Sequence, residues 1–253
     1  MKRRNFRRPA APPLKPGQTE YEFGIPIPGT ILPPDQWAKT AIKRMGDGPM
    51  DWTEIFSRPG PLALDIGCGN GRFTIASAIA RPEWNHIAID FLPAVVRYGT
   101  RRGNQRGLAN CRFAVIDGWR MLHTCCSDQS LSEIHIYHPQ PYSDPNKSHM
   151  RMLTPEFILR MHECLVNSGR VYIQTDREAY WDYISMAMKS VFDWQPVETD
   201  WPDGPEFRSR REILARKQGL PIFRGIATRK NDWQRESLDE IIAKLAMPVF
   251  EFE

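Results

Sequence analysis

The sequence lacks any apolar run near the ~20 residues that a membrane-spanning helix requires, and no apolar segment follows its basic first residues. We therefore expect no membrane anchor and no secretory signal, and a cytoplasmic protein. No C-x-x-C pair occurs among the five cysteines, Cys68, Cys111, Cys125, Cys126 and Cys164. This absence favours reduced thiols over a disulfide framework or a zinc site, and we expect no bound metal. The adjacent thiols at 125 and 126 could be redox-active, but two incidental thiols are the simpler interpretation.

Positive charge is spread unevenly along the chain. The 253 residues carry a formal net charge of +4, yet six basic residues precede the first acidic one, Glu20, and leave the remainder net acidic. Residues 1–35 are also rich in proline, which disrupts helices and sheet ladders, so we expect a flexible, extended arm. A basic arm favours contact with an anionic polymer, while a solvated tail without a function is the alternative.

After this arm, short apolar runs alternate with helical patterns. The patterns predict strands at 62–66, 86–90, 111–116, 134–138, 170–176 and 223–228. They predict helices at 35–45, 72–80, 92–105, 119–123, 154–164, 180–191 and 238–245. This alternation indicates an α/β, Rossmann-like fold, with a mostly parallel sheet and helices on both faces. We divide the chain into the arm (1–35), one Rossmann-like domain (36–232) and a C-terminal helical extension (233–253).

The run from Leu62 to Gly71 joins an apolar strand to three glycines, Gly67, Gly69 and Gly71. Glycine tolerates positive φ and lets a ligand approach the backbone. Dinucleotide-binding proteins space their glycines as G-x-G-x-x-G, which differs from this run and disfavours an NAD-dependent dehydrogenase. The order Asp-x-Gly-x-Gly-x-Gly, which begins at Asp65, resembles the first motif of S-adenosylmethionine-dependent methyltransferases. An ordinary glycine-rich turn is the alternative.

The resemblance implies S-adenosylmethionine as the cofactor. An acidic residue before the glycines, Asp65, suits the positively charged sulfonium end of that molecule. Asp90 ends the second predicted strand, where an acid accepts hydrogen bonds from ribose hydroxyls, and a surface acid in a turn is the alternative. Asp117 follows the third strand and would reach the exocyclic amine of adenine, while the small Gly118 would leave room for the ring.

A second stretch resembles the bacterial tRNA (guanine-N7)-methyltransferase family, over roughly residues 60–230. That family carries Phe-Pro-Asp-Pro-Trp-x-Lys after its fourth strand, then a basic run and Pro-Glu-Phe. Residues 138–144 read His-Pro-Gln-Pro-Tyr-Ser-Asp, and Pro-Glu-Phe lies at 155–157, so that the spacing between the two motifs matches that of the family without a gap. The family's Thr-Asp after the fifth strand matches Thr175 and Asp176. Its late Thr-x-Phe-Glu motif falls on residues 205–208.

The departures from the family lie where it handles guanine. Gln140 replaces an Asp, Tyr142 a Trp and Asp144 a Lys, whereas the cofactor motif is intact. In the late motif, Arg208 replaces the acid and Glu206 lies nearby. The resemblance therefore implies two catalytic residues, Asp176 and Gln140. It implies a substrate-binding set of Tyr142, Asp144, Thr175, Asp176, Glu206 and Arg208.

The chemistry expected of these residues is positioning and charge stabilisation. Guanine N7 carries a lone pair and needs no general base, so the enzyme mainly aligns it with the methyl group. Methylation leaves a cationic purine, which a carboxylate such as Asp176 stabilises. Gln140 keeps a hydrogen-bond acceptor without the charge, and Tyr142 could stack on the base.

Three interpretations stay open on the sequence alone. The first is an active methyltransferase on tRNA or another structured RNA. The second is a methyltransferase of this fold on a different acceptor, because the base pocket differs. The third is a non-catalytic relative that binds the cofactor or RNA. We expect an RNA partner, no membrane partner, and a monomer or a homodimer.

Overall fold

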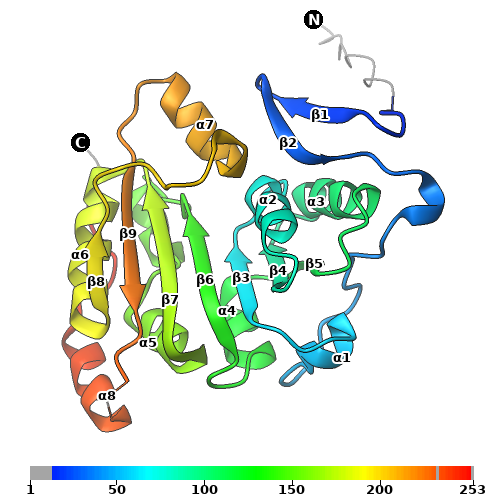
Figure 1. Cartoon of the computed structure of the whole chain (residues 1–253). Helices are drawn as coiled ribbons and strands as arrows, with labels where there is room; N and C mark the ends of the chain where they lie inside the picture. Colours follow the sequence, from blue (N-terminus) through cyan, green and yellow to red (C-terminus); the bar gives the residue numbers. More distant parts are fainter. Residues whose placement is uncertain (1–12, 232–233, 252–253) are drawn as a thin grey trace, which may run out of the picture.

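A computed structural model describes residues 13–231 and 234–251 (Figure 1). Its main sheet has seven strands in the order β5-β4-β3-β6-β7-β9-β8. Five run parallel, namely β3 (Leu62–Ile66), β4 (Asn85–Asp90), β5 (Cys111–Val115), β6 (Leu131–Tyr137) and β7 (Leu165–Thr175). The antiparallel pairs are made by β9 (Phe223–Thr228), with β7 on one side and β8 (Asp193–Pro196) on the other. The prediction of a mostly parallel α/β sheet is confirmed.

Helices cover the sheet on both faces, because alternate residues of each strand point to opposite sides. In β4, Ala88 packs in a cluster with α2 (Arg72–Ala80) and α3 (Pro93–Gln105), whereas Ile87 and Ile89 belong to the larger opposite cluster. The larger cluster includes buried residues of α1 (Trp52–Phe56), η2 (Met121–Cys125), α5 (Pro155–Cys164), α6 (Glu178–Val191) and α8 (Arg235–Lys244). Further helical elements are α4 (Gly118–Arg120), α7 (Arg210–Lys217), η1 (Pro34–Gln36), η3 (Pro145–Met150) and η4 (Pro205–Phe207).

Local signals in the sequence explain several boundaries. The hydroxyl of Thr154 accepts a hydrogen bond from the Phe157 amide (3.3 Å), and Pro155 occupies the first turn of α5. Gly71 begins α2 with φ of 78°, and a Cβ atom there would lie 2.9 Å from the Phe113 ring. The third glycine of the motif is therefore required by close packing among α2, α3 and β5.

The prediction that prolines exclude a sheet ladder throughout residues 1–35 is wrong. Two antiparallel strands, β1 (Thr19–Glu22) and β2 (Ile25–Thr30), form a hairpin that lies beside α2 and α3 (Figure 1). A two-stranded ribbon has only edge strands, where proline is tolerated because its missing N–H faces away from the partner. Ile27 is fully buried in the cluster with α2 and α3, so the hairpin is part of the folded body. The first twelve residues of the expected arm lie outside the described residues.

The predicted helix at 35–45 is also wrong. Only the short η1 forms, and the following chain is extended, with Thr40 and Ile42 hydrogen-bonded to Phe113 at the edge of β5. Strand β7 begins at Leu165, five residues before the start of the strand predicted at 170–176. Neither β8 nor α7 is predicted from the sequence. By contrast, α2 and β9 have the predicted bounds.

Candidate active site

The glycine loop between β3 and α2 lies where the parallel strands end, near the hairpin in Figure 1. Gly67 and Gly69 have φ of 78° and 54°, values that favour glycine, and a Cβ atom on either would meet nothing within 4 Å. The amides of Gly67 and Cys68 both donate to the Ile89 carbonyl at 2.9 Å, which ties the loop to β4. The loop thus presents open space against its backbone, as a bound nucleotide-like molecule requires.

Asp90 orders this loop from the end of β4. Its Oδ2 accepts a hydrogen bond from the Gly69 amide (3.1 Å) and its Oδ1 from the Leu92 amide (2.9 Å). A carboxylate has about four lone-pair directions, so both oxygens can accept further hydrogen bonds. The expected contact with ribose hydroxyls stays a prediction, and it is compatible with this arrangement.

Asp65 lies inside the domain rather than on the loop surface, with 5% of its area exposed. The hydroxyl of Thr74 in α2 donates to its Oδ2 at 2.5 Å. Burial raises the pKa of Asp65 to about 7, with a further contribution from the charge on Asp90 and opposition from the Thr74 hydrogen bond. The side chain expected near the sulfonium is therefore a carboxyl that gains or loses its proton near neutral pH.

Asp117 and Gly118 follow β5. The Oδ1 of Asp117 accepts from the Arg120 amide (2.8 Å) and caps α4. A Cβ atom on Gly118 would lie 2.9 Å from Ile66 Cγ2 and 3.2 Å from the Met152 sulfur. Close packing thus gives an independent reason for glycine at 118, in addition to the predicted space for adenine.

The hairpin holds the glycine loop by charged contacts. Both carboxylate oxygens of Glu22 accept from Asn70 Nδ2, at 2.9 and 3.0 Å. Arg102 of α3 donates to the Asn70 carbonyl (3.1 Å) and to Glu20 (2.8 and 3.0 Å). Sequence reasoning missed these residues because it treated the hairpin as part of a flexible arm.

A second group of polar side chains lies at the ends of β6 and β7. Nδ1 of His138 is 2.9 Å from Oδ1 of Asp176, and Arg211 of α7 donates to Oδ2 of the same carboxylate. Burial alone would raise the pKa of Asp176, but the hydrogen bonds from His138 and Arg211 outweigh it and hold this pKa well below its usual range. Asp176 is therefore ionised, and its carboxylate accepts hydrogen bonds from two side chains.

The hydrogen-bond network also fixes the tautomer of His138. Trp201 donates its indole N–H to Gln174 Oε1 (2.7 Å), which turns the Gln174 amide nitrogen toward His138 Nε2 (2.9 Å). An amide NH₂ only donates, so Nε2 accepts and the ring proton lies on Nδ1, facing Asp176. Sequence analysis named neither His138 nor Arg211 as a site residue.

The loop after His138 carries the other predicted acceptor-side residues. Gln140 and Asp144 are exposed, Tyr142 is half-buried with φ of 44°, and Asp144 caps η3 through the Asn146 amide (3.1 Å). The loop is fixed from its inner side by Arg151, which donates to the Pro141 carbonyl (2.8 Å) and the Tyr142 carbonyl (3.1 Å). The same guanidinium also donates to the carbonyls of Pro248 and Phe250, so the chain end supports this loop.

Three further predicted residues have different surroundings. Thr175 is buried and its hydroxyl accepts from the Arg177 amide (3.2 Å), while Glu206 is half-buried in η4. Arg208 is buried and ion-paired with Asp203 and, at 3.4 Å, with Glu212. Its guanidinium also donates to the carbonyls of Trp201 and Asp203, and the predicted substrate contact of Arg208 stays a prediction.

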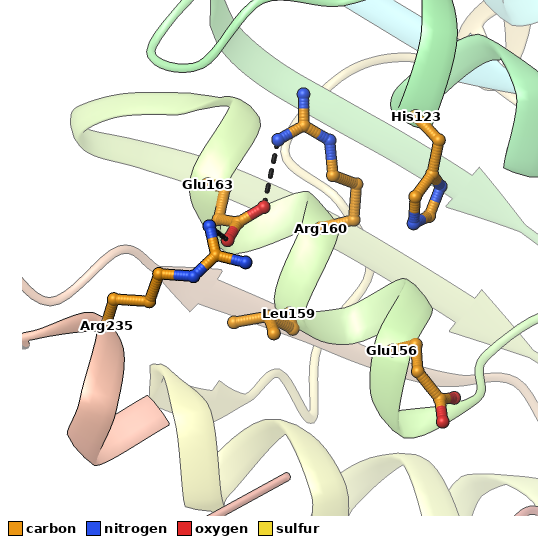
Figure 2. Close-up of a pocket in the computed structure, with 6 residues that line it drawn as sticks. All are labelled: His123, Glu156, Leu159, Arg160, Glu163 and Arg235. Atoms are coloured by element: carbon orange, nitrogen blue, oxygen red, sulfur yellow. Dashed lines mark hydrogen bonds and ion pairs between the residues drawn. The ribbon is translucent and has the colours of Figure 1, made fainter. Parts of the chain in front are cut away.

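A separate cavity of about 340 Å³ lies among η2, α5 and α8 (Figure 2). Three of its charged side chains are paired with one another, since Glu163 binds Arg160 and Arg235, each at 2.9 Å. Within the described ranges, no cluster of three His, Cys, Asp or Glu residues is arranged to hold a metal ion. In that same part of the chain, no helix has the length and apolar character needed to cross a bilayer.

The strand order, the antiparallel β9 and the open glycine loop define a Rossmann-like methyltransferase fold. Solved structures share it. The 16S rRNA methyltransferase KamB has a TM-score of 0.54 and 13% identity, covering 76% of this chain and 99% of its own. The 16S rRNA (adenine(1408)-N(1))-methyltransferase from Catenulisporales acidiphilia, solved with its cosubstrate SAM, has a TM-score of 0.51 and 13% identity, with coverage of 73% and 94%.

The chain belongs to the family described as "Putative methyltransferase", which matches residues 59–224. Similar proteins include the tRNA (guanine-N(7)-)-methyltransferase of Saccharophagus degradans, 27% identical over 188 residues, which are 74% of this chain and 82% of that protein. The enzyme of the same name from Klebsiella pneumoniae is 29% identical over 164 residues, 64% of this chain and 69% of that protein.

Proposed function

We propose that this protein transfers a methyl group from S-adenosylmethionine to N7 of a guanine in tRNA. The observation that carries the proposal is the open glycine loop, held by Asp90, in a chain similar to tRNA (guanine-N(7)-)-methyltransferases over most of its length. The choice of acceptor rests on similarity to the relatives from Saccharophagus and Klebsiella, and the choice of cofactor rests on the glycine loop. We further propose that it acts in the cytoplasm as a monomer or a homodimer.

The residues around the loop fit the cofactor. Gly67 and Gly69 leave the space that the molecule needs, Asp90 would accept from the ribose, and Asp117 has a second oxygen for the adenine amine. When bound, S-adenosylmethionine supplies a methyl group on a positively charged sulfur. That positive charge would favour the ionised form of Asp65, whose pKa burial raises to about 7.

On the acceptor side, we propose that Asp176 faces the base that becomes cationic. His138 and Arg211 hold its carboxylate in one orientation, which is the kind of preorganised charge that stabilises a developing cation without reorganisation. Gln140 would contribute an amide from an exposed position, and the half-buried Tyr142 would pack against the ring.

A second candidate is methyl transfer to a different acceptor. The pairing of Asp176 with Arg211 favours it, because the positive guanidinium offsets the negative charge that would stabilise a cationic methylated purine. The departures at Gln140, Tyr142 and Asp144 point in the same direction.

Transfer of labelled methyl from S-adenosylmethionine to unmodified tRNA, small RNA and protein, followed by nucleoside analysis, tests both candidates. We expect label in 7-methylguanosine of tRNA. Label in another nucleoside or in protein would replace the first candidate by the second, and no label in any fraction would leave only a binding function.

A further inference from the structure

A groove of about 660 Å³ runs along the outer edge of the sheet, between α3, the end of β5 and the extended chain at 37–45. Its floor is apolar and includes Ile42, Val96 and Phe113. Val115, which lies two residues before Asp117, and Trp37 also line it. The groove is therefore adjacent to the cofactor strands but distinct from the glycine loop.

The charged side chains on the groove wall are all positive. Lys43, Arg97 and Arg101 line it, and among its described lining residues there is no Asp or Glu. Lys43, Arg97 and Arg101 are exposed, and Arg101 lies 4.0 Å from Glu20 and over the ring of Tyr98. Three cations on a largely apolar groove, which also includes Thr100 and Asn104, attract an anion, and they repel the basic first residues of this same chain.

The aromatic side chain of Trp37 is fixed in place at the groove although it is 41% exposed. Its indole N–H donates to the Leu32 carbonyl at 2.8 Å, which limits rotation of the ring. An exposed, pre-ordered aromatic ring next to cations is the combination that binds a base and its phosphates, because bases stack on aromatic faces while cations neutralise the backbone.

We propose that this groove binds a nucleotide segment of the RNA substrate, with a base stacked on Trp37 and phosphates at Lys43, Arg97 and Arg101. The inference rests on the proposed function and names a second contact with the same RNA. In the sheet, β5 lies four strand spacings from β7, which bears Asp176 at its end. At ~4.8 Å per spacing this is ~19 Å, so the groove holds a nucleotide other than the one that is methylated.

The test compares RNA binding by the full-length protein and matched variants. The double variant Lys43→Gln/Arg97→Gln removes two charges from the groove, and Lys189→Gln/Lys244→Gln removes two from exposed positions on α6 and α8. For a labelled single-stranded RNA and for unmodified tRNA, we expect the groove variant to bind about 10-fold more weakly. Its log–log salt slope falls by about 1.4, at ~0.7 per contact on a single strand. The control pair keeps the wild-type slope on the single strand.

A third variant isolates stacking from charge. Trp37→Ala should weaken binding roughly 5- to 150-fold with an unchanged salt slope, and Trp37→Phe should recover part of the loss. Melting temperature and calorimetric affinity for S-adenosylhomocysteine serve as checks that each variant is folded. Polyglutamate, an anion without bases, should compete poorly with RNA.

The outcomes separate the groove from the proposed function. If wild type methylates tRNA but the groove variants bind and react like the control pair, the groove assignment is overturned and the function stands. If wild type methylates no tRNA while single-stranded RNA binding still depends on Trp37 and Arg97, the groove stands and the function fails. Equal competition by polyglutamate, with no effect of Trp37→Ala, would indicate an acidic protein partner and overturn the RNA assignment.

Discussion

Nδ1 of His138 lies 2.9 Å from Oδ1 of Asp176, and both side chains are almost completely buried. The histidine gives the acid of this site a hydrogen-bonding partner that an apolar ring at this position would not supply. Arg211 binds the other carboxylate oxygen. The chain thus lacks the carboxylate expected at 140 and holds the remaining one with two donors.

Replacement of Asp176 by Asn tests whether this carboxylate acts on the acceptor. We expect Asp176→Asn to lower single-turnover methyl transfer by about 10²- to 10³-fold, the scale for loss of one preorganised polar group. Affinity for S-adenosylmethionine should change by no more than a few-fold. The control is Asp182→Asn, an exposed acid on α6. Unchanged turnover in Asp176→Asn would remove this residue from the catalytic set.

The substitution Gln140→Asp tests the effect of the missing charge. Gln140 is exposed, so a carboxylate there costs little folding stability. If the product is cationic 7-methylguanine, the added charge should raise the rate on tRNA by about 10-fold, equivalent to roughly 1.4 kcal/mol. Single-turnover rates of wild type, Gln140→Asp and Gln140→Ala provide the comparison. A lower rate with Asp than with Gln would contradict a cationic product.

A branched side chain on the glycine loop should abolish cofactor binding. Gly69 has positive φ and open space above its Cα, so Val there suffers backbone strain and fills the space. Gly17→Val is the matched control, because Gly17 also has positive φ (83°) and a Cβ atom there would have no neighbour within 4 Å. Calorimetry with S-adenosylhomocysteine should show at least a 100-fold loss, on the order of 2.7 kcal/mol, for Gly69→Val and little change for Gly17→Val.

Asp65 makes stability depend on pH in a direction opposite to most carboxyls. Its pKa is raised by burial to about 7, whereas in the unfolded chain it is about 3.9. The folded protein therefore binds the proton more tightly, and the stability that this proton contributes is complete below pH ~4 and is lost as pH rises through 7. The loss is at most about 1.4 kcal/mol per pH unit.

Asp65→Asn should remove this contribution. Urea unfolding of both proteins at pH 5, 6, 7 and 8 gives the difference in their free energies of unfolding, in which the other titrating groups cancel. We expect the variant to gain stability relative to wild type as pH rises to 7 and to show a constant difference above pH 8. A difference independent of pH throughout would show that Asp65 is ionised at pH 5.

The sequence predicts those parts of the fold whose signals are local. The glycines specify the start of α2, and the apolar run at 223–228 specifies β9. The hairpin is not predictable in this way, because Glu20 is held by Arg102 and Arg106, which lie 82 and 86 residues away in the chain. The group of His138, Asp176 and Arg211 is likewise assembled from three separate elements.

Removal of residues 2–12 tests the role of the basic first segment. These residues contain five of the cations, at positions 2, 3, 4, 7 and 8, and lie outside the described residues. The deletion spares the hairpin, whose first strand begins at Thr19, so the glycine loop keeps its contacts through Glu22.

If the segment contacts duplex RNA, the log–log salt slope of tRNA binding should fall by about 0.9 per lost phosphate contact, up to ~4.5 for five. Because the rest of the chain is net acidic, affinity at low salt should fall as well. Cofactor affinity should be unchanged, and a slope equal to that of wild type would show that the segment is a solvated tail.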